Sequence, residues 1–250
     1  MQHRRIKILG VPVDAVNFEK ALSWVEDAVS KHGNKRIIAV NPEKVMAARH
    51  DKELLNFLEA SDLLIPDGIG IVKAARLLGL ASMERVAGSD LMPAICNLCA
   101  KKGYEIFIYG SRSGVNEKAR KILSERFPSL KIAGWSHGYV PENEMDLLVE
   151  KINNSEAQIL FVALGSPKQE KWLAAYGPRL TSVKVSQGIG GTLDTIAGNV
   201  KRAPLFFQKI NLEWFYRLVT NPKRARRQTA LLFFVILVVK ELFKKKLKFI

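Results

Sequence analysis

The stretch Ile159–Glu170, ILFVALGSPKQE, places six consecutive apolar residues directly before a Gly-Ser-Pro turn and the first residues of a helical pattern. A strand with one face in water alternates apolar and polar side chains, whereas a strand covered on both faces is apolar throughout. Residues 159–164 therefore predict an interior strand of a parallel sheet, and the turn after them predicts a return into a helix.

Short β-rich runs of this kind alternate with helical patterns along the chain. We expect strands at Lys7–Leu9, Arg36–Val40, Leu63–Ile65, Glu105–Tyr109, Lys131–Ala133, Gln158–Leu164 and Lys184–Ser186. We expect helices at Phe18–Lys31, Lys52–Ala60, Ile71–Leu78, Asp90–Lys102, Val115–Arg126, Glu142–Asn153 and Gln169–Tyr176. The alternation predicts an α/β fold in which a mainly parallel sheet carries helices on both faces. Hydrophobic residues make up 48% of the 250 residues, which is enough for a sizeable core. We place that core at residues 1–195.

The end of the chain has a different character. The last fifty residues carry 13 Lys/Arg against 2 Asp/Glu, which is +11 of the net charge of +15. Thr192–Val200 predicts a helix or turn, Phe206–Val219 an aromatic helix, and Asn221-Pro222 a break before a final helix. We therefore expect residues 196–250 to form a helical appendage.

The final helix contains an apolar stretch, Ala230–Val239, between basic clusters at Lys223–Arg227 and Lys244–Lys248. Ten apolar residues cover about 15 Å as helix, whereas roughly 20 are needed to cross a bilayer. This pattern is typical of a helix that lies in the membrane interface, with its basic side chains near anionic lipid. A buried helix with a solvated basic tail is the alternative. Because the first residues lack a signal peptide's long apolar region, we expect a peripheral protein on the cytoplasmic face of the cell membrane.

Two other classes of partner can be weighed from the sequence. Nucleic acid would suit the charge, but we find no zinc-finger spacing, no RNA-recognition aromatic motif and few aromatic residues among the basic clusters. We therefore expect no nucleic-acid partner. Cys96 and Cys99 form a C-x-x-C pair within an expected helix, and no further paired Cys/His motif supplies zinc ligands. We expect packing thiols, no metal and no other cofactor.

Glycine-rich turns follow four of the expected strands, at Pro66–Gly70, Gly110–Gly114, Gly165–Glu170 and Gln187–Thr192. Ligands of open α/β sheets bind beyond the carboxyl ends of the strands. Glycine admits a ligand to the backbone there, and helix N-termini favour phosphate. None of the turns is a Walker loop or a complete dinucleotide fingerprint. Together they predict a phosphate-bearing ligand at this edge of the sheet.

Polar side chains in and beside these turns have both structural and chemical interpretations. Asp67 could cap the following helix or act as a base facing the cleft. Gln169 could close a capping box with the serine three residues before it, or face a ligand. Asn41 could be a turn residue or a partner for a sugar hydroxyl, and Arg85 could pair with Glu84 or with phosphate. The residues alone leave these alternatives open.

The chain resembles the WecG/TagA/CpsF family of bacterial glycosyltransferases (glycosyltransferase family 26) over nearly its whole length. The motifs that carry the resemblance are, in order, Val40–Glu43 (VNPE), Pro66–Gly70 (PDGIG), Glu84–Gly88 (ERVAG), Tyr109–Ser111 (YGS), Leu164–Glu170 (LGSPKQE), Gly188–Gly191 (GIGG) and Glu213–Arg217 (EWFYR), followed by Pro222 and arginines. Some relatives carry a threonine two positions before the asparagine, where this chain has Ala39 and lacks that hydroxyl.

This resemblance implies a Rossmann-like fold with a C-terminal appendage that closes over the active site at the membrane. It implies transfer of an N-acetylmannosamine-type sugar from a UDP donor to undecaprenyl-diphosphate-linked N-acetylglucosamine, in the synthesis of teichoic acid or another surface polysaccharide. The family's catalytic aspartate, asparagine and arginine correspond to Asp67, Asn41 and Arg85. The expected substrate-binding residues are Gly68, Gly110, Ser111, Gly165, Lys168, Gln169, Gly188, Gly190, Gly191, Asp194, Arg217, Arg224 and Arg227.

The mechanism expected from these residues is an inverting displacement, in which Asp67 accepts the proton of the attacking hydroxyl while UDP leaves. The chain has no Asp-x-Asp metal motif, so arginines and backbone amides are expected to offset the charge of the diphosphate. A non-catalytic nucleotide-sugar-binding protein that tethers a partner enzyme is the main alternative, and a nucleotide hydrolase is another. A homo-oligomer is also open, because apolar surface on the appendage could serve a second copy of the chain as well as lipid.

Overall fold

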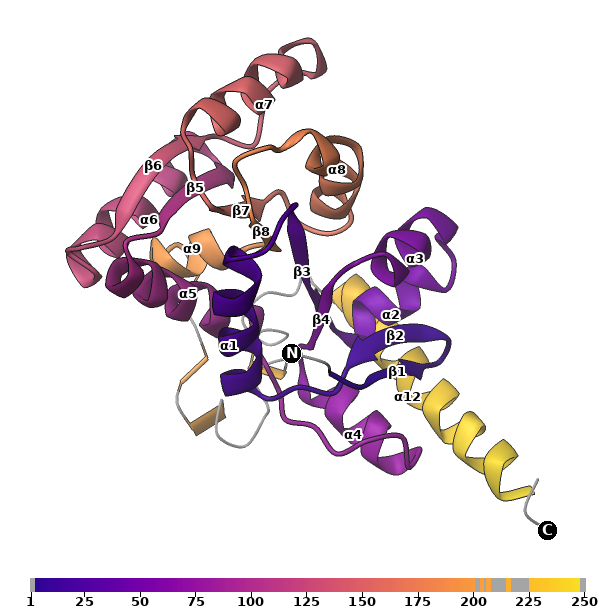
Figure 1. The fold of residues 1–250 in the computed structure, drawn as a ribbon. Helices are drawn as coiled ribbons and strands as arrows, with labels where there is room; N and C mark the ends of the chain where they lie inside the picture. Colours follow the sequence, from indigo (N-terminus) through magenta and orange to yellow (C-terminus); the bar gives the residue numbers. More distant parts are fainter. Residues whose placement is uncertain (1–2, 201–202, 205, 208–214, 217–224, 248–250) are drawn as a thin grey trace.

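A parallel sheet forms the centre of the computed structural model, which describes residues 3–200, 203–204, 206–207, 215–216 and 225–247 (Figure 1). Its six strands are arranged in the order β4-β3-β8-β7-β5-β6, with every neighbouring pair parallel. The strands are β3 (Lys35–Val40), β4 (Leu63–Pro66), β5 (Glu105–Gly110), β6 (Lys131–Ser136), β7 (Ile159–Ala163) and β8 (Val185–Gly188). The predicted α/β fold with a mainly parallel sheet is therefore confirmed.

Helices cover both faces of this sheet, and each face has its own hydrophobic cluster. One face carries α1 (Phe18–Val29), α5 (Gly88–Lys102), α6 (Ser113–Arg126) and α9 (Thr192–Ile196). The other carries α2 (Pro42–Ala48), α3 (Lys52–Glu59), α4 (Ile69–Leu77), α7 (Met145–Asn154), α8 (Lys168–Tyr176) and α12 (Ala225–Leu247). Successive residues of a strand point to opposite faces, so Ile159 and Phe161 of β7 join the first cluster while Leu160 and Val162 join the second. All five residues of β7 are buried, as the apolar run predicts.

Two elements differ from the sequence prediction. The strand expected at Lys7–Leu9 is half of an antiparallel hairpin, β1 (Arg5–Ile8) and β2 (Val11–Asp14). The second half was not expected because Pro12 disfavours a strand interior. The helix α2 is also not among the expected elements, because the sequence left Asn41 as either a turn residue or a partner for a sugar hydroxyl. In the structure Asn41 is the N-cap and Pro42 the first helical residue, which is the position where proline is best tolerated in a helix.

Several pairs of neighbouring strands lead to opposite faces of the sheet. The chain leaves β3 for α2 on one face, and it leaves the adjacent β8 for α9 on the other. In the same way β7 leads into α8 while its neighbour β5 leads into α6. Such divergence opens a crevice beyond the carboxyl ends of the strands, where ligands of open α/β sheets bind.

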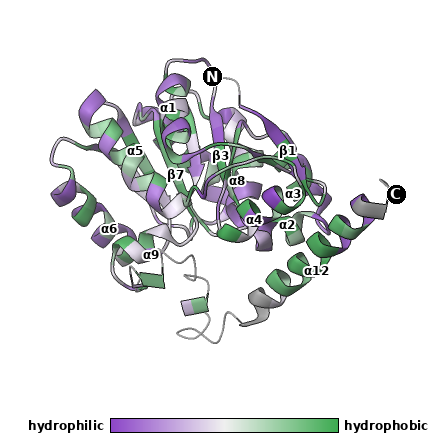
Figure 2. Ribbon diagram, turned by 90° about the horizontal axis from the view of Figure 1, so that it is seen from below, coloured by the Kyte–Doolittle hydropathy of each residue, from purple (hydrophilic) through white to green (hydrophobic). Residues whose placement is uncertain are grey.

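The terminal helix α12 extends beyond the expected apolar stretch on both sides and has 23 residues. It packs against α2 and α4, with Phe234 and Val238 buried one turn apart. Its other side leaves large apolar residues exposed, and Figure 2 shows hydrophobic residues along much of the helix. None of the helices in the described ranges has the length and apolar character that a membrane span requires. The buried-helix alternative is thus right for one face of α12 and wrong for the opposite face.

The predicted aromatic helix at 206–219 and the break at Asn221-Pro222 fall mostly outside the described residues. The predicted division at residue 195 stays a prediction. The short helix α9, which ends at Ile196, packs against α5 and α6 and contributes Leu193 to the core.

Candidate active site

Asp67 lies at the carboxyl edge of the sheet, directly after β4. Its backbone N–H donates to the carbonyl of Val40 (2.8 Å), which continues the pairing of β4 with β3. Its Oδ2 lies 3.5 Å from the backbone nitrogen of Gly88, the first residue of α5. A helix N-terminus stabilises negative charge, so the start of α5 suits the ionised carboxylate. The helix-cap interpretation of Asp67 is wrong, since Gly68 occupies the N-cap position of α4.

Two glycines, Gly68 and Gly88, lie beside this carboxylate. Gly68 has φ +97°, a conformation that strongly favours glycine. A Cβ added to Gly88 would lie 3.4 Å from Cβ of Ala39 and 3.8 Å from Oδ2 of Asp67. The half-buried Arg85 belongs to the loop before α5, and the next residue joins this loop to the end of β4, because the N–H of Val86 donates to the carbonyl of Pro66 (2.9 Å). The structure therefore brings the arginine loop to the same strand end as Asp67.

Asn41 stands at the end of the neighbouring strand, β3. Its Oδ1 accepts a hydrogen bond from the backbone N–H of Lys44 (2.8 Å), so Asn41 starts α2 rather than forming a turn. Lys44 then turns inward, and its ammonium group forms an ion pair with Glu170 of α8. The two side chains are only 5% and 1% exposed. A buried ion pair thus joins the helix after β3 to the helix after β7.

Gln169 extends this connection to a third strand. Its Nε2 donates to Oε1 of Glu170 (3.1 Å), and its Oε1 accepts from the backbone N–H of Gly190 (2.9 Å), in the turn after β8. A Cβ on Gly188 would lie 2.6 Å from this Nε2, so the glycine makes room for the amide. The capping-box alternative for Gln169 is wrong, because α8 begins at Lys168 without a side-chain cap.

Gln187, in β8, adds a second buried amide. It is 0% exposed, and its Nε2 lies 3.4 Å from the carbonyl of Gly88. Its Oε1 is buried and accepts no hydrogen bond from the part of the chain that the structure describes. Sequence reasoning did not select Gln187, Lys44 or Glu170, although Glu170 closes one of the motifs. A lysine in the first turn of a helix gives no local sign that it is buried.

The turn after β5 lies against the end of β7. Gly110 has φ +126°, and a Cβ there would come within 2.5 Å of the backbone of Ala163. The N–H of Ser111 donates to the Ala163 carbonyl (2.9 Å). The structure therefore gathers the loops after β3, β4, β7, β8 and β5 along one edge, as the parallel topology predicts.

The remaining predicted binding residues divide by position. Gly165 lies in the turn after β7 with φ +75°, and Lys168 is exposed at the start of α8. Gly190 and Gly191 lie between β8 and α9, and Asp194 is half-buried in the first turn of α9. Arg217 and Arg224 lie outside the described residues. For Arg227 the structure describes only its place in α12.

Cys96 and Cys99 are fully buried in α5, which confirms the predicted packing role. Burial raises the pKa of the Cys99 thiol to about 12, and it raises the pKa of the Cys96 thiol as well. Among the described residues, no group of three or more His, Cys, Asp or Glu side chains is placed to hold a metal ion.

Comparison with known proteins gives a consistent result. The family model described as "Glycosyl transferase WecG/TagA/CpsF family" matches residues 6–248. A Bacillus subtilis (strain 168) protein is 39% identical over 210 residues, which cover 84% of this chain and 81% of that protein. A Staphylococcus aureus (strain MRSA252) protein is 31% identical over 246 residues, 98% of this chain and 95% of its own. Both are named N-acetylglucosaminyldiphosphoundecaprenol N-acetyl-beta-D-mannosaminyltransferase. The chain therefore belongs to the glycosyl transferase WecG/TagA/CpsF family.

Proposed function

We propose that this protein transfers N-acetylmannosamine from a UDP donor to undecaprenyl-diphosphate-linked N-acetylglucosamine, a step of teichoic acid-type synthesis. Relatives that cover most of the chain carry the name of this activity. The observation that carries the proposal is Asp67, a half-buried carboxylate beyond a parallel strand, beside the N-terminus of α5 and the glycine-rich turns. A general base in this reaction must lie within hydrogen-bonding distance of the acceptor hydroxyl, close to the diphosphate of the donor.

In the proposed reaction, the acceptor hydroxyl oxygen attacks the anomeric carbon of the donor sugar. Asp67 accepts the hydroxyl proton as the new carbon–oxygen bond forms. The bond from the anomeric carbon to the diphosphate breaks on the opposite side, and UDP leaves with the electron pair. This geometry inverts the configuration at that carbon. Asn41, at the neighbouring strand end, would orient sugar hydroxyls in this reaction.

The diphosphate gains charge as it leaves, and this charge needs donors or cations. Backbone N–H groups of the turns at Gly110, Gly165 and Gly190 can supply some of them, in the manner of anion sites at helix N-termini. Arg85 and Lys168 are cations that the described residues supply at this edge. We propose that Arg217, Arg224 and Arg227 supply the remainder, so that no metal ion is required.

The proposed location is the cytoplasmic surface of the membrane, where a lipid-linked acceptor would be found. The exposed apolar side of α12 supports this, because a helix with one apolar face and flanking lysines is suited to the bilayer interface. The arginines before α12 and in its first turn would then reach the active site when the appendage meets lipid.

A radiolabelled donor assay with a synthetic polyprenyl-diphosphate N-acetylglucosamine tests the activity. The proposal predicts label in the lipid-linked product, and release of UDP that depends on the acceptor. UDP release without acceptor would instead indicate a nucleotide hydrolase. Donor binding with no consumption would indicate a tethering protein that binds nucleotide sugar.

A chain truncated before Lys201 tests the role of the appendage. The proposal predicts that truncation lowers turnover even with a water-soluble acceptor, because the arginines are lost together with the membrane contact. Normal turnover of the soluble acceptor would reduce the appendage to an anchor.

A further inference from the structure

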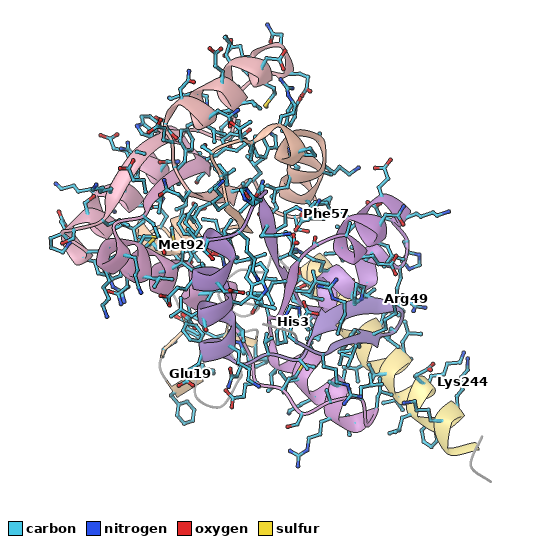
Figure 3. The ribbon with its side chains drawn as sticks, in the orientation of Figure 1. His3, Glu19, Arg49, Phe57, Met92 and Lys244 are labelled. Carbon is cyan, nitrogen blue, oxygen red and sulfur yellow. The ribbon has the colours of Figure 1, made fainter. Side chains whose placement is uncertain are left out.

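A groove of about 490 Å³ lies on the side of the molecule where α12 passes the hairpin, away from the carboxyl edge of the sheet. The hairpin contributes Lys7 and Leu9, the end of α2 contributes Arg49, and the segment after α4 contributes Leu80. One side of α12 forms the remaining wall. Figure 3 shows Arg49 and Lys244, from the two walls, on the same side of the molecule.

The three sides of α12 have different surroundings. Phe234, Val238 and Leu242, spaced by four residues, face the core. The wall of the groove is a second stripe, with the spacing i, i+3, i+4, i+7 and i+8 of one helix side; it consists of Leu237, Lys240, Glu241, Lys244 and Lys245. The third side is exposed and apolar, and consists of Leu232, Phe233, Val235, Ile236, Val239 and Phe243. The basic groove therefore borders the apolar side along the C-terminal half of the helix.

The groove is strongly cationic. Five Lys or Arg side chains line it, together with one carboxylate, that of Glu241. Three of the cations have partners in the protein: Lys7 pairs with Glu59 (2.8 Å), Arg49 donates to the carbonyl of Leu9 (2.8 Å), and Lys245 donates to the carbonyl of Leu78 (2.9 Å).

These contacts hold the walls together, because Arg49 fixes the hairpin to α2 and Lys245 fixes α12 to the end of α4. Lys240 and Lys244 are exposed, and neither makes a hydrogen bond or ion pair with another residue that the structure describes. A rigid concave surface with two uncommitted ammonium groups is suited to an anion.

We propose that this groove binds the phosphate-bearing headgroup of an anionic phospholipid, in addition to the substrates of the active site. The phosphate would lie between Lys244, Lys240 and Arg49, while the acyl chains follow the adjacent apolar side of α12 into the bilayer. An anionic phospholipid has a charged headgroup and apolar acyl chains. A cationic groove bordered by apolar surface is therefore more complementary to such a lipid than to a free anion. This inference rests on the proposed membrane location, but it requires no sugar transfer.

The site would orient the protein as well as attract it. Non-specific electrostatic attraction between a basic tail and anionic lipid does not determine which side of the helix faces the bilayer. A headgroup held between α12 and the hairpin would direct the apolar side of α12 toward the bilayer. It would thereby fix the angle at which the carboxyl edge of the sheet meets the lipid-linked acceptor.

The test uses the full chain and dihexanoyl-phosphatidylglycerol below its micelle concentration, titrated by calorimetry. We expect saturable binding of one lipid per chain. Dihexanoyl-phosphatidylcholine, which has a phosphate but no net charge, and inorganic phosphate should each bind more weakly. Arg49→Ala and Lys244→Ala should each weaken binding about fivefold, since one basic side chain near an anionic lipid contributes that factor. Lys240→Ala repeats the test with an exposed side chain, should Arg49→Ala lower the melting temperature.

Lys121→Ala, on α6 at the opposite face of the sheet, is the matched control with the same loss of charge. Binding that does not saturate, or equal affinities for Arg49→Ala and Lys121→Ala, would overturn the proposal in favour of diffuse attraction. Inorganic phosphate binding as tightly as the lipid would assign the groove to a free anion. Self-association that covers α12 and prevents lipid binding would assign the helix to an interface between copies. Because these titrations contain neither donor nor acceptor, failure of the headgroup site and failure of the proposed activity are distinguishable.

Discussion

The buried ion pair between Lys44 and Glu170 makes a quantitative prediction about stability. Replacing Glu170 by Gln leaves the Lys44 ammonium buried, with a neutral amide in place of its carboxylate partner. Breaking a buried ion pair from one side costs about 3–5 kcal/mol of the free energy of unfolding. For a protein of this size, each kcal/mol lowers the melting temperature by about 2–4 °C. We therefore expect Glu170→Gln to melt roughly 6–20 °C below the wild type.

Two further variants separate the charge from the packing. Lys44→Met alone should be destabilising for the same reason, since among the described residues it leaves the Glu170 carboxylate with Gln169 as its remaining partner. The double variant Lys44→Met/Glu170→Met should recover much of the loss, because apolar residues of similar volume often replace a buried pair without cost. Glu53→Gln removes one partner of an exposed pair, Lys171–Glu53, and should have almost no effect.

The free energies of unfolding are measured by urea denaturation, monitored by circular dichroism, for all four variants. Because Glu170 also holds Gln169 toward Gly190, the affinity for UDP should fall in both single variants. The reasoning would be refuted if Glu170→Gln were no less stable than Glu53→Gln. It would also be refuted if the double variant Lys44→Met/Glu170→Met were less stable than both single variants, because replacing the whole pair removes the unpaired buried charge.

Three other predictions concern single features of the structure. Gly188→Ala should lower turnover about 10²-fold, because its Cβ would lie 2.6 Å from Nε2 of Gln169 and move that amide. A turnover equal to that of the wild type would contradict this. Gly110→Ala should be strongly destabilising in urea, since its Cβ would meet the backbone of Ala163 at 2.5 Å with φ at +126°. Burial raises the pKa of the Cys99 thiol from 9.0 to about 12, so between these pH values the unfolded chain loses this proton while the folded protein keeps it. The free energy of unfolding should therefore be unaffected by Cys99 below pH 9 and should decrease as the pH rises from 9 toward 12. Urea denaturation should show a smaller decrease for Cys96→Ala/Cys99→Ala than for the wild type.

Local sequence patterns predicted the elements that are buried or strongly amphipathic. The apolar run of β7 and the helix α1, whose buried residues recur at helical spacing, are examples. Patterns were weaker at the edges of the sheet. The expected strand at Lys131–Ala133 continues to Ser136 in the structure, because an edge strand with a partly exposed face has no continuous apolar run. The second strand of the hairpin and the helix α2 were not predicted because each contains a proline, Pro12 and Pro42. Proline can either interrupt a regular element or begin one, and the local sequence does not show which.

The sequence predicted where the backbone of the candidate site lies, but not which side chains contact one another there. Parallel strands place their carboxyl ends together, so the glycine-rich turns predicted one edge of the sheet. Side-chain partners were not predictable, because Lys44 and Glu170 are separated by 126 residues and only the folded sheet brings α2 beside α8. For the same reason the sequence could not decide between the capping and ligand-facing alternatives for Asp67 and Gln169. Both side chains bond to backbone groups from distant parts of the sequence rather than to the adjacent helix.

The most direct test of the proposed mechanism is the turnover number of Asp67→Asn with saturating UDP-N-acetylmannosamine and acceptor, measured beside its affinity for UDP. Asparagine preserves the shape of the side chain but cannot accept the hydroxyl proton as a carboxylate does. We predict a turnover reduced about 10²–10⁴-fold, with the melting temperature and the affinity for UDP unchanged. A folded Asp67→Asn protein that transfers sugar at nearly the wild-type rate would contradict the assignment of Asp67 as the base.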